Sequence, residues 1–87
     1  KMKEIKMFMF ESCPHCAKAR KLISSLLDAK PEYKEIPFVM IDEKLQPEEA
    51  DKCDYFYVPC FFVGDEKVHE GAVDAEKVKA VFEKAAE

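Results

Sequence analysis

The sequence predicts one α/β domain, residues 1–87, built on a four-stranded mixed sheet with helices on both faces. A chain of 87 residues suits a single domain and leaves no room for a second core. Apolar residues make up 48% of the chain, so a core can form without cross-links, and only 2 residues are Gly, which argues against disorder. Segments with the apolar period of strands alternate with segments of helical period, in the order β-α-β-α-β-β-α.

A buried strand and a long helix open the chain. Apolar residues occupy both faces of residues 3–10, which is typical of a strand covered by layers on two sides. Pro14 suits the first position of a helix whose cap is Ser12 or Cys13. The helical pattern then continues to about Ala29.

A second strand and a short helix occupy the middle of the chain. The strand is expected over residues 35–41, and Pro37 within it indicates an edge strand because proline cannot donate to a strand ladder. Pro47 opens the short helix, which is expected to run through about Cys53. Because a helix joins the first two strands, they should lie parallel with a right-handed crossover.

A hairpin and a last helix complete the chain. Strands are expected over residues 61–63 and 68–71, around a turn at residues 64–67. Asp74 is placed to cap the final helix. The apolar positions of that helix are Val78, Val81, Phe82 and Ala85.

Charge and hydropathy limit the partners of the chain. Asp and Glu outnumber Lys and Arg by 18 to 14, and this acidic balance disfavours nucleic acid and membrane surfaces as partners. The sequence shows neither the apolar stretch of a signal peptide nor a run long enough to span a membrane. We therefore expect a cytoplasmic protein, and a monomer, in a reducing compartment where purely structural disulfides are rare.

Cys13-Pro14-His15-Cys16 is the motif that carries chemistry, at the junction of the first strand and the long helix. Its two cysteines lie one helical turn apart, so their sulfurs can reach bonding distance. Cys13 falls at the exposed helix N-terminus, where unpaired amides and the helix dipole favour its thiolate. Cys16 falls on the apolar face and should be shielded. We therefore expect Cys13 to attack a substrate disulfide and Cys16 to resolve the mixed disulfide, with Pro14 and His15 completing the catalytic motif.

Zinc binding is the main alternative for this pair of cysteines. The chain has 4 Cys, and Cys together with His suits zinc. Structural zinc sites usually draw their ligands from two closely spaced pairs, however, and Cys53 and Cys60 are not spaced in that way. We therefore expect no metal at the site.

The motif resembles that of the thioredoxin-fold oxidoreductases, and among them the small glutaredoxins and glutaredoxin-like thioredoxins. Val58-Pro59 ahead of the third strand and Gly71 ahead of the last helix match the same pattern, so the resemblance covers nearly the whole chain. It implies a thioredoxin-like fold in its minimal four-stranded form. It also implies that Pro59 is cis and packs against the two cysteines, and that the Val58 backbone pairs with an incoming peptide or glutathione. Tyr57, next to Val58, is expected to line the substrate groove.

Departures from the glutaredoxin pattern bear on the substrate. Glu11 stands where the family places a lysine that holds a glutathione carboxylate, and Tyr57 stands where it places a threonine. The Gly-Gly pair before the last helix is replaced by Gly71-Ala72, which is similar to thioredoxins. These differences weaken the expected glutathione site. Pro14-His15 is similar to the dipeptide of the oxidising Dsb-type proteins, which implies a more oxidising disulfide than Gly-Pro would give.

Cys53 and Cys60 have two open interpretations. Both can be small buried hydrophobic residues, as free cysteines often are. Alternatively Cys60, which directly follows Pro59, is an auxiliary thiol close to the active site, either alone or in a second redox pair with Cys53.

The residues and the resemblance together predict an enzyme, a disulfide oxidoreductase of glutathione or thioredoxin type with a Cys13/Cys16 dithiol. It would reduce or exchange protein disulfides or glutathione mixed disulfides, with no built-in cofactor and with glutathione as a candidate co-substrate. Electrons would come from glutathione or from a flavin-dependent reductase. The alternative is a glutaredoxin-type scaffold that holds an iron–sulfur cluster or a metal on the same thiols.

Overall fold

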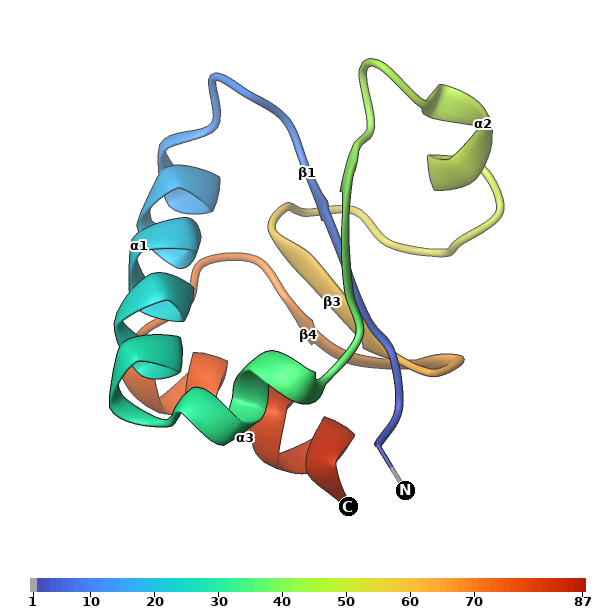
Figure 1. The fold of residues 1–87 in the computed structure, drawn as a ribbon. Helices are drawn as coiled ribbons and strands as arrows, with labels where there is room; N and C mark the ends of the chain where they lie inside the picture. Colours follow the sequence, from blue (N-terminus) through green and yellow to red (C-terminus); the bar gives the residue numbers. More distant parts are fainter. Residues whose placement is uncertain (1) are drawn as a thin grey trace.

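The computed structural model describes residues 2–87 and has the predicted order of elements (Figure 1). The strands are β1 (Ile5–Met9), β2 (Phe38–Asp42), β3 (Cys60–Val63) and β4 (Glu66–Glu70). The helices are α1 (Pro14–Ala29), α2 (Pro47–Ala50) and α3 (Ala75–Ala86), with a 3₁₀ turn over Pro31–Glu35. No helix within residues 2–87 combines the length and the apolar composition that crossing a membrane requires.

The strands form one mixed sheet in the order β2-β1-β3-β4. β1 pairs parallel with β2 and antiparallel with β3, and β4 completes an antiparallel hairpin with β3. β2 therefore lies at an edge, as predicted, and β1 is an inner strand. The predicted fold class, a four-stranded mixed sheet with helices on both faces, is confirmed.

The side chains of β1 alternate between two hydrophobic clusters, one on each face of the sheet. Ile5, Met7 and Met9 belong to the large cluster, to which α1 and α3 contribute. Phe8 belongs to the small cluster on the opposite face, where Ala50 of α2 packs. Figure 1 shows α1 and α3 apart from the single turn of α2. Packing on two sides explains why apolar residues occupy both faces of this strand.

Helix α3 packs through apolar positions that the sequence predicted and that are all buried: Val78, Val81, Phe82 and Ala85. At its start, the Asp74 carboxylate accepts the backbone N–H of Lys77 at 2.9 Å, which confirms the predicted cap. The Phe82 ring stacks on Tyr33 and Phe38, with centroid distances of 5.7 and 5.9 Å. This aromatic group ties the last helix to the edge strand and to the 3₁₀ turn.

The second strand begins later than predicted. It starts at Phe38 and not at residue 35, because Pro31 opens a 3₁₀ turn that runs to Glu35. Pro37 therefore lies just before the strand, where its missing N–H costs no ladder hydrogen bond.

The second helix and the hairpin turn are both shorter than predicted. α2 ends at Ala50, and the chain continues from there as turns, which brings Cys53 against the small cluster. β4 already begins at Glu66, so only Gly64 and Asp65 connect the two strands of the hairpin. Gly64 has a φ of 60°, a conformation that glycine adopts readily and that allows this tight reversal.

Phe82→Ala should lower the free energy of unfolding by about 3–5 kcal/mol, because it leaves a cavity beneath Tyr33 and Phe38. The Phe82 ring is only 1% exposed. Urea unfolding at neutral pH measures the change. Phe56→Ala is the matched control: the Phe56 side chain is 83% exposed, so its loss should change stability by less than about 0.5 kcal/mol. Equal effects of the two substitutions would contradict this account of the core.

Candidate active site

The motif lies where β1 leads into α1. Cys13 is the cap residue of α1, with an extended backbone at φ −78° and ψ 117°, and Pro14 takes the first helical position. The Cys13 Sγ accepts the backbone N–H of Cys16 at 3.2 Å. Of the two predicted caps, Ser12 and Cys13, the structure therefore selects the sulfur. The sulfur thus lies at the positive end of the helix dipole.

Cys16 faces the core from the first turn of α1. It is fully buried in the large cluster, as its place on the apolar face predicted. Burial raises the pKa of the Cys16 thiol far above its ordinary value, and the hydrogen bond with the Cys13 side chain raises this pKa further. The backbone at Phe10 and the positive charge of Arg20 act in the opposite direction. The pKa of the Cys16 thiol is therefore raised, while the Cys13 sulfur accepts the Cys16 backbone N–H.

Cys13 is less exposed than its position at a helix terminus predicted. Only 4% of the residue is accessible, because the sulfur folds back over the first turn and packs into the large cluster. Its neighbours in the chain are exposed: Glu11, Ser12, Pro14 and His15. The expectation of an exposed cap is thus wrong for the sulfur itself, although the residues on either side of it lie at the surface.

The predicted cis peptide bond between Val58 and Pro59 is present, and Pro59 is buried. The register of β3 with β1 pairs Cys60 with Phe8. Val58 and Pro59, which precede Cys60 in the chain, therefore lie beside the end of β1 that leads into the motif. Val58 is half-buried and packs against both hydrophobic clusters, of which the large one contains the two motif cysteines. Direct packing of Pro59 on the two sulfurs stays a prediction.

The backbone of Val58 is unpaired in the part of the chain that the structure describes. Within residues 2–87, neither the N–H nor the C=O of Val58 forms a hydrogen bond. The next carbonyl, that of Pro59, is already occupied, since it accepts the N–H of Gly71 at 2.9 Å. Tyr57 is 70% exposed beside this opening. An extended peptide that adds to a sheet requires free backbone groups of this kind.

Glu70 is a residue of this region that the sequence did not reveal. Its Oε2 accepts the backbone N–H groups of Phe56 and Tyr57, the latter at 2.8 Å, and its Oε1 accepts from Lys67 at 2.8 Å. The Lys67 hydrogen bond, followed by the two backbone N–H groups, lowers the pKa of Glu70 from 4.5 to about 2. The two backbone donors lie 14 and 13 positions away in the chain, so no local pattern marks this residue.

Cys60 lies on the opposite face of the sheet from the motif. It is fully buried in the small cluster, against which Cys53 also packs. Successive side chains of a strand point to opposite faces, so following Pro59 in the chain does not bring Cys60 to the motif. Burial, followed by the charge of Glu70, raises the pKa of Cys60 to about 12. The predicted position of Cys60 close to the motif is therefore wrong, because Cys60 is part of the small cluster on the other face. A redox pair of Cys60 with Cys53, which packs against the same cluster, stays a prediction.

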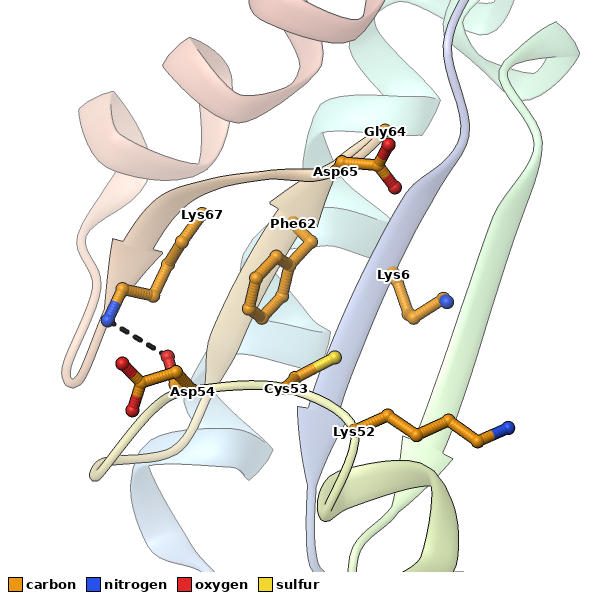
Figure 2. A pocket seen from close by; sticks show the side chains of 8 residues that line it. All are labelled: Lys6, Lys52, Cys53, Asp54, Phe62, Gly64, Asp65 and Lys67. Carbon is orange, nitrogen blue, oxygen red and sulfur yellow. Dashed lines mark hydrogen bonds between the residues drawn. The ribbon is translucent and has the colours of Figure 1, made fainter.

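A pocket opens on this second face, over β1, β3 and β4 (Figure 2). The residues that line it are Lys6, Lys52, Cys53, Asp54, Phe62, Gly64, Asp65 and Lys67. Neither cysteine of the motif is among them. The pocket is therefore separate from the candidate active site.

Metal ligands do not gather in the part of the chain that the structure describes. Among residues 2–87, no three His, Cys, Asp or Glu side chains are placed to hold one ion. Within that range the Cys13/Cys16 pair lacks a third donor. The zinc and iron–sulfur alternatives therefore gain no support from the side chains of this chain.

A family model described as Glutaredoxin matches residues 5–68, which include both the motif and Val58-Pro59. The chain belongs to the glutaredoxin family. Membership agrees with the geometry at the start of α1, because the match spans the strand, the cysteines and the helix that together form the candidate site. A search of curated proteins found no match.

Solved structures similar to this glutaredoxin-family chain include several thioredoxins. Oxidised thioredoxin from Plasmodium falciparum superposes with a TM-score of 0.74 at 19% identity, over 100% of this chain and 84% of that one. Oxidised thioredoxin O1 from Arabidopsis thaliana gives 0.71 at 21% identity, over 99% and 79%. Reduced desulfothioredoxin from Desulfovibrio vulgaris Hildenborough gives 0.68 at 22% identity, over 97% and 82%. These likenesses confirm the predicted thioredoxin-like fold.

Cys60 should resist alkylation by iodoacetamide in the folded protein at mildly alkaline pH. Its thiol is buried and burial raises its pKa to about 12, so the reactive thiolate is scarce. Mass spectrometry of peptides after timed labelling measures the rate. Half-buried Cys53 is the internal control and should react faster, while unfolding in guanidinium chloride should make the two rates similar. Equal rates in the folded protein would contradict the burial of Cys60.

Glu70→Gln should destabilise the protein at neutral pH and much less in acid. Because folding lowers the Glu70 pKa, the carboxylate stabilises the fold above pH 4.5, and this contribution is lost as the pH falls from 4.5 to about 2. Thermal unfolding of both proteins at neutral pH and near the acid end of that range measures the difference. Glu66→Gln, on the same strand, is the control. A stability difference that does not shrink in acid would argue against the Glu70 carboxylate as its source.

Proposed function

We propose that this protein is a thiol–disulfide oxidoreductase that reduces or exchanges protein disulfides, or glutathione mixed disulfides, through Cys13 and Cys16. The asymmetry of the two sulfurs carries the proposal. Cys13 Sγ accepts the Cys16 amide at the helix N-terminus, while the Cys16 thiol is buried and holds its proton. Membership in the glutaredoxin family supports the same class of reaction.

The proposed reaction consists of two thiol–disulfide exchanges. The Cys13 thiolate attacks one sulfur of the substrate disulfide, forms a mixed disulfide and releases the other substrate sulfur as a thiolate. Cys16 then gives up its proton and attacks the Cys13 sulfur, so that the remaining substrate sulfur leaves and the Cys13–Cys16 disulfide forms. Two electrons pass to the substrate, and the protons lost by the two cysteines end on the two released thiolates.

The surroundings of the two sulfurs favour proteins over glutathione as substrates. Glu11 is exposed beside the motif, where its negative charge repels the carboxylates of glutathione. The free backbone groups of Val58 and the exposed ring of Tyr57 suit an extended peptide. We therefore rank protein disulfides first, with glutathione as a candidate co-substrate.

The proposed cycle closes with electrons from outside the chain. Glutathione or a flavin-dependent reductase would reduce the Cys13–Cys16 disulfide, in the cytoplasm. The protein would act as a monomer, with no resident cofactor or metal and with no nucleic-acid or membrane partner. Exposed His15, between Pro14 and the buried Cys16, would stabilise the thiolate and make the disulfide more oxidising than one that encloses Gly-Pro.

Trapping of intermediates tests the proposal. Cys16→Ser should accumulate mixed disulfides on Cys13, because the resolving thiol is gone, and dithiothreitol should release the captured species. Cys13→Ser should capture nothing and should lose the catalysed reduction of insulin by dithiothreitol. Cys53→Ser is the matched control, since it removes a thiol from the other face of the sheet and should retain insulin reduction.

Two outcomes would contradict the proposal. One is insulin reduction that persists in Cys13→Ser, and the other is a set of mixed disulfides found on Cys53 or Cys60 in place of Cys13. A brown protein with visible absorption after aerobic purification would favour an iron–sulfur scaffold instead.

A further inference from the structure

The loop between α2 and β3 is held against β4 by the side chains of Lys67 and Glu70. Lys67 Nζ donates to the backbone carbonyl of Asp54 at 3.2 Å, which Figure 2 shows as a dashed line. Glu70 accepts the backbone N–H groups of Phe56 and Tyr57. Lys67 and Glu70 are also paired with each other at 2.8 Å. Together these bonds fix the backbone of a segment that belongs to no helix or strand.

The fixed loop exposes aromatic side chains. Phe56 is 83% exposed and Tyr57 is 70% exposed. Such rings contribute little to the core, and neighbouring exposed apolar side chains commonly mark a surface that binds another molecule. Residues 55–60 carry no charged side chain. The surface therefore suits an uncharged, apolar stretch of polypeptide better than a small charged molecule.

We propose that Glu70 is a positioning residue for polypeptide substrates, an inference that rests on the proposed function. By holding two N–H groups of the loop, Glu70 sets the direction of the chain into Val58, whose own N–H and C=O have no hydrogen-bond partner among residues 2–87. An extended segment with apolar residues beside its disulfide pairs with Val58 and packs on the rings of Phe56 and Tyr57. A small disulfide needs only the Cys13 sulfur and gains nothing from this loop.

Steady-state kinetics with two substrates test the inference. One substrate is a peptide with apolar residues on both sides of its disulfide, and the other is bis(2-hydroxyethyl) disulfide. Glu70→Ala should raise KM for the peptide about tenfold, because re-ordering the released loop on binding would cost about 1.4 kcal/mol, the equivalent of a tenfold change in affinity. It should leave kcat for the peptide, and both constants for the small disulfide, within about twofold. Glu70→Gln keeps one oxygen acceptor and should therefore raise KM for the peptide less than Glu70→Ala does.

Glu66→Ala is the matched control. Glu66 lies on the same strand, is exposed and pairs with Lys84 at 3.6 Å, so its removal should change the kinetics with neither substrate. Phe56→Ser gives a second route that leaves Glu70 in place, and it should also raise KM for the peptide. If Glu70→Ala does not fold, as judged by thermal unfolding, Glu70→Gln decides the question in its place, by a peptide KM that rises while both constants for the small disulfide stay unchanged.

Three outcomes separate the possibilities. Equal losses with both substrates would show that Glu70 only maintains the fold, and this would overturn the inference. An unchanged peptide KM in a folded Glu70→Ala would overturn it as well, whatever the result with Phe56→Ser. If the unsubstituted protein reduces neither substrate, the proposed function itself fails, and the inference fails with it.

Discussion

The bond from the Cys16 amide to the Cys13 sulfur, at 3.2 Å, is the contact on which the rest of the site depends. It makes a sulfur the cap of α1, so the same atom begins the helix and satisfies one of its free amides. It also distinguishes the two cysteines, because the Cys13 sulfur accepts an amide N–H whereas burial raises the pKa of the Cys16 thiol. One hydrogen bond therefore begins the helix and also supports the proposed division of roles between the two cysteines.

β1 determines where that helix terminus lies. It is an inner strand packed on both faces, so the point at which the chain leaves it for the motif is held from two sides. The rest of the candidate site comes from the hairpin of β3 and β4 and from Val58 and Pro59 just before it. The register of the hairpin pairs Cys60, which follows Pro59, with Glu70. Segments from the first and the second half of the chain thus meet at one end of the sheet.

The sequence predicts best what depends on neighbours in the chain. Pro14, the spacing of the cysteines and the apolar period of α1 predict the helix and its first turn, because all of these interactions are local. The burial of Cys13 and the face taken by Cys60 depend on packing between distant segments. Glu70 receives its backbone donors from 13 and 14 positions away. The cis bond before Pro59 was predictable only through the family resemblance, since an isolated proline is more often trans.

The placement of the thiols on two faces also limits how the folded chain can cross-link. Four cysteines can pair in three ways. Cys13 and Cys16 belong to one hydrophobic cluster. Cys53 and Cys60 belong with the other, so two of the three pairings would require a disulfide through a packed sheet. The sheet therefore prevents disulfides between cysteines of different faces in the folded chain, and it does so without changing the reactivity of any thiol.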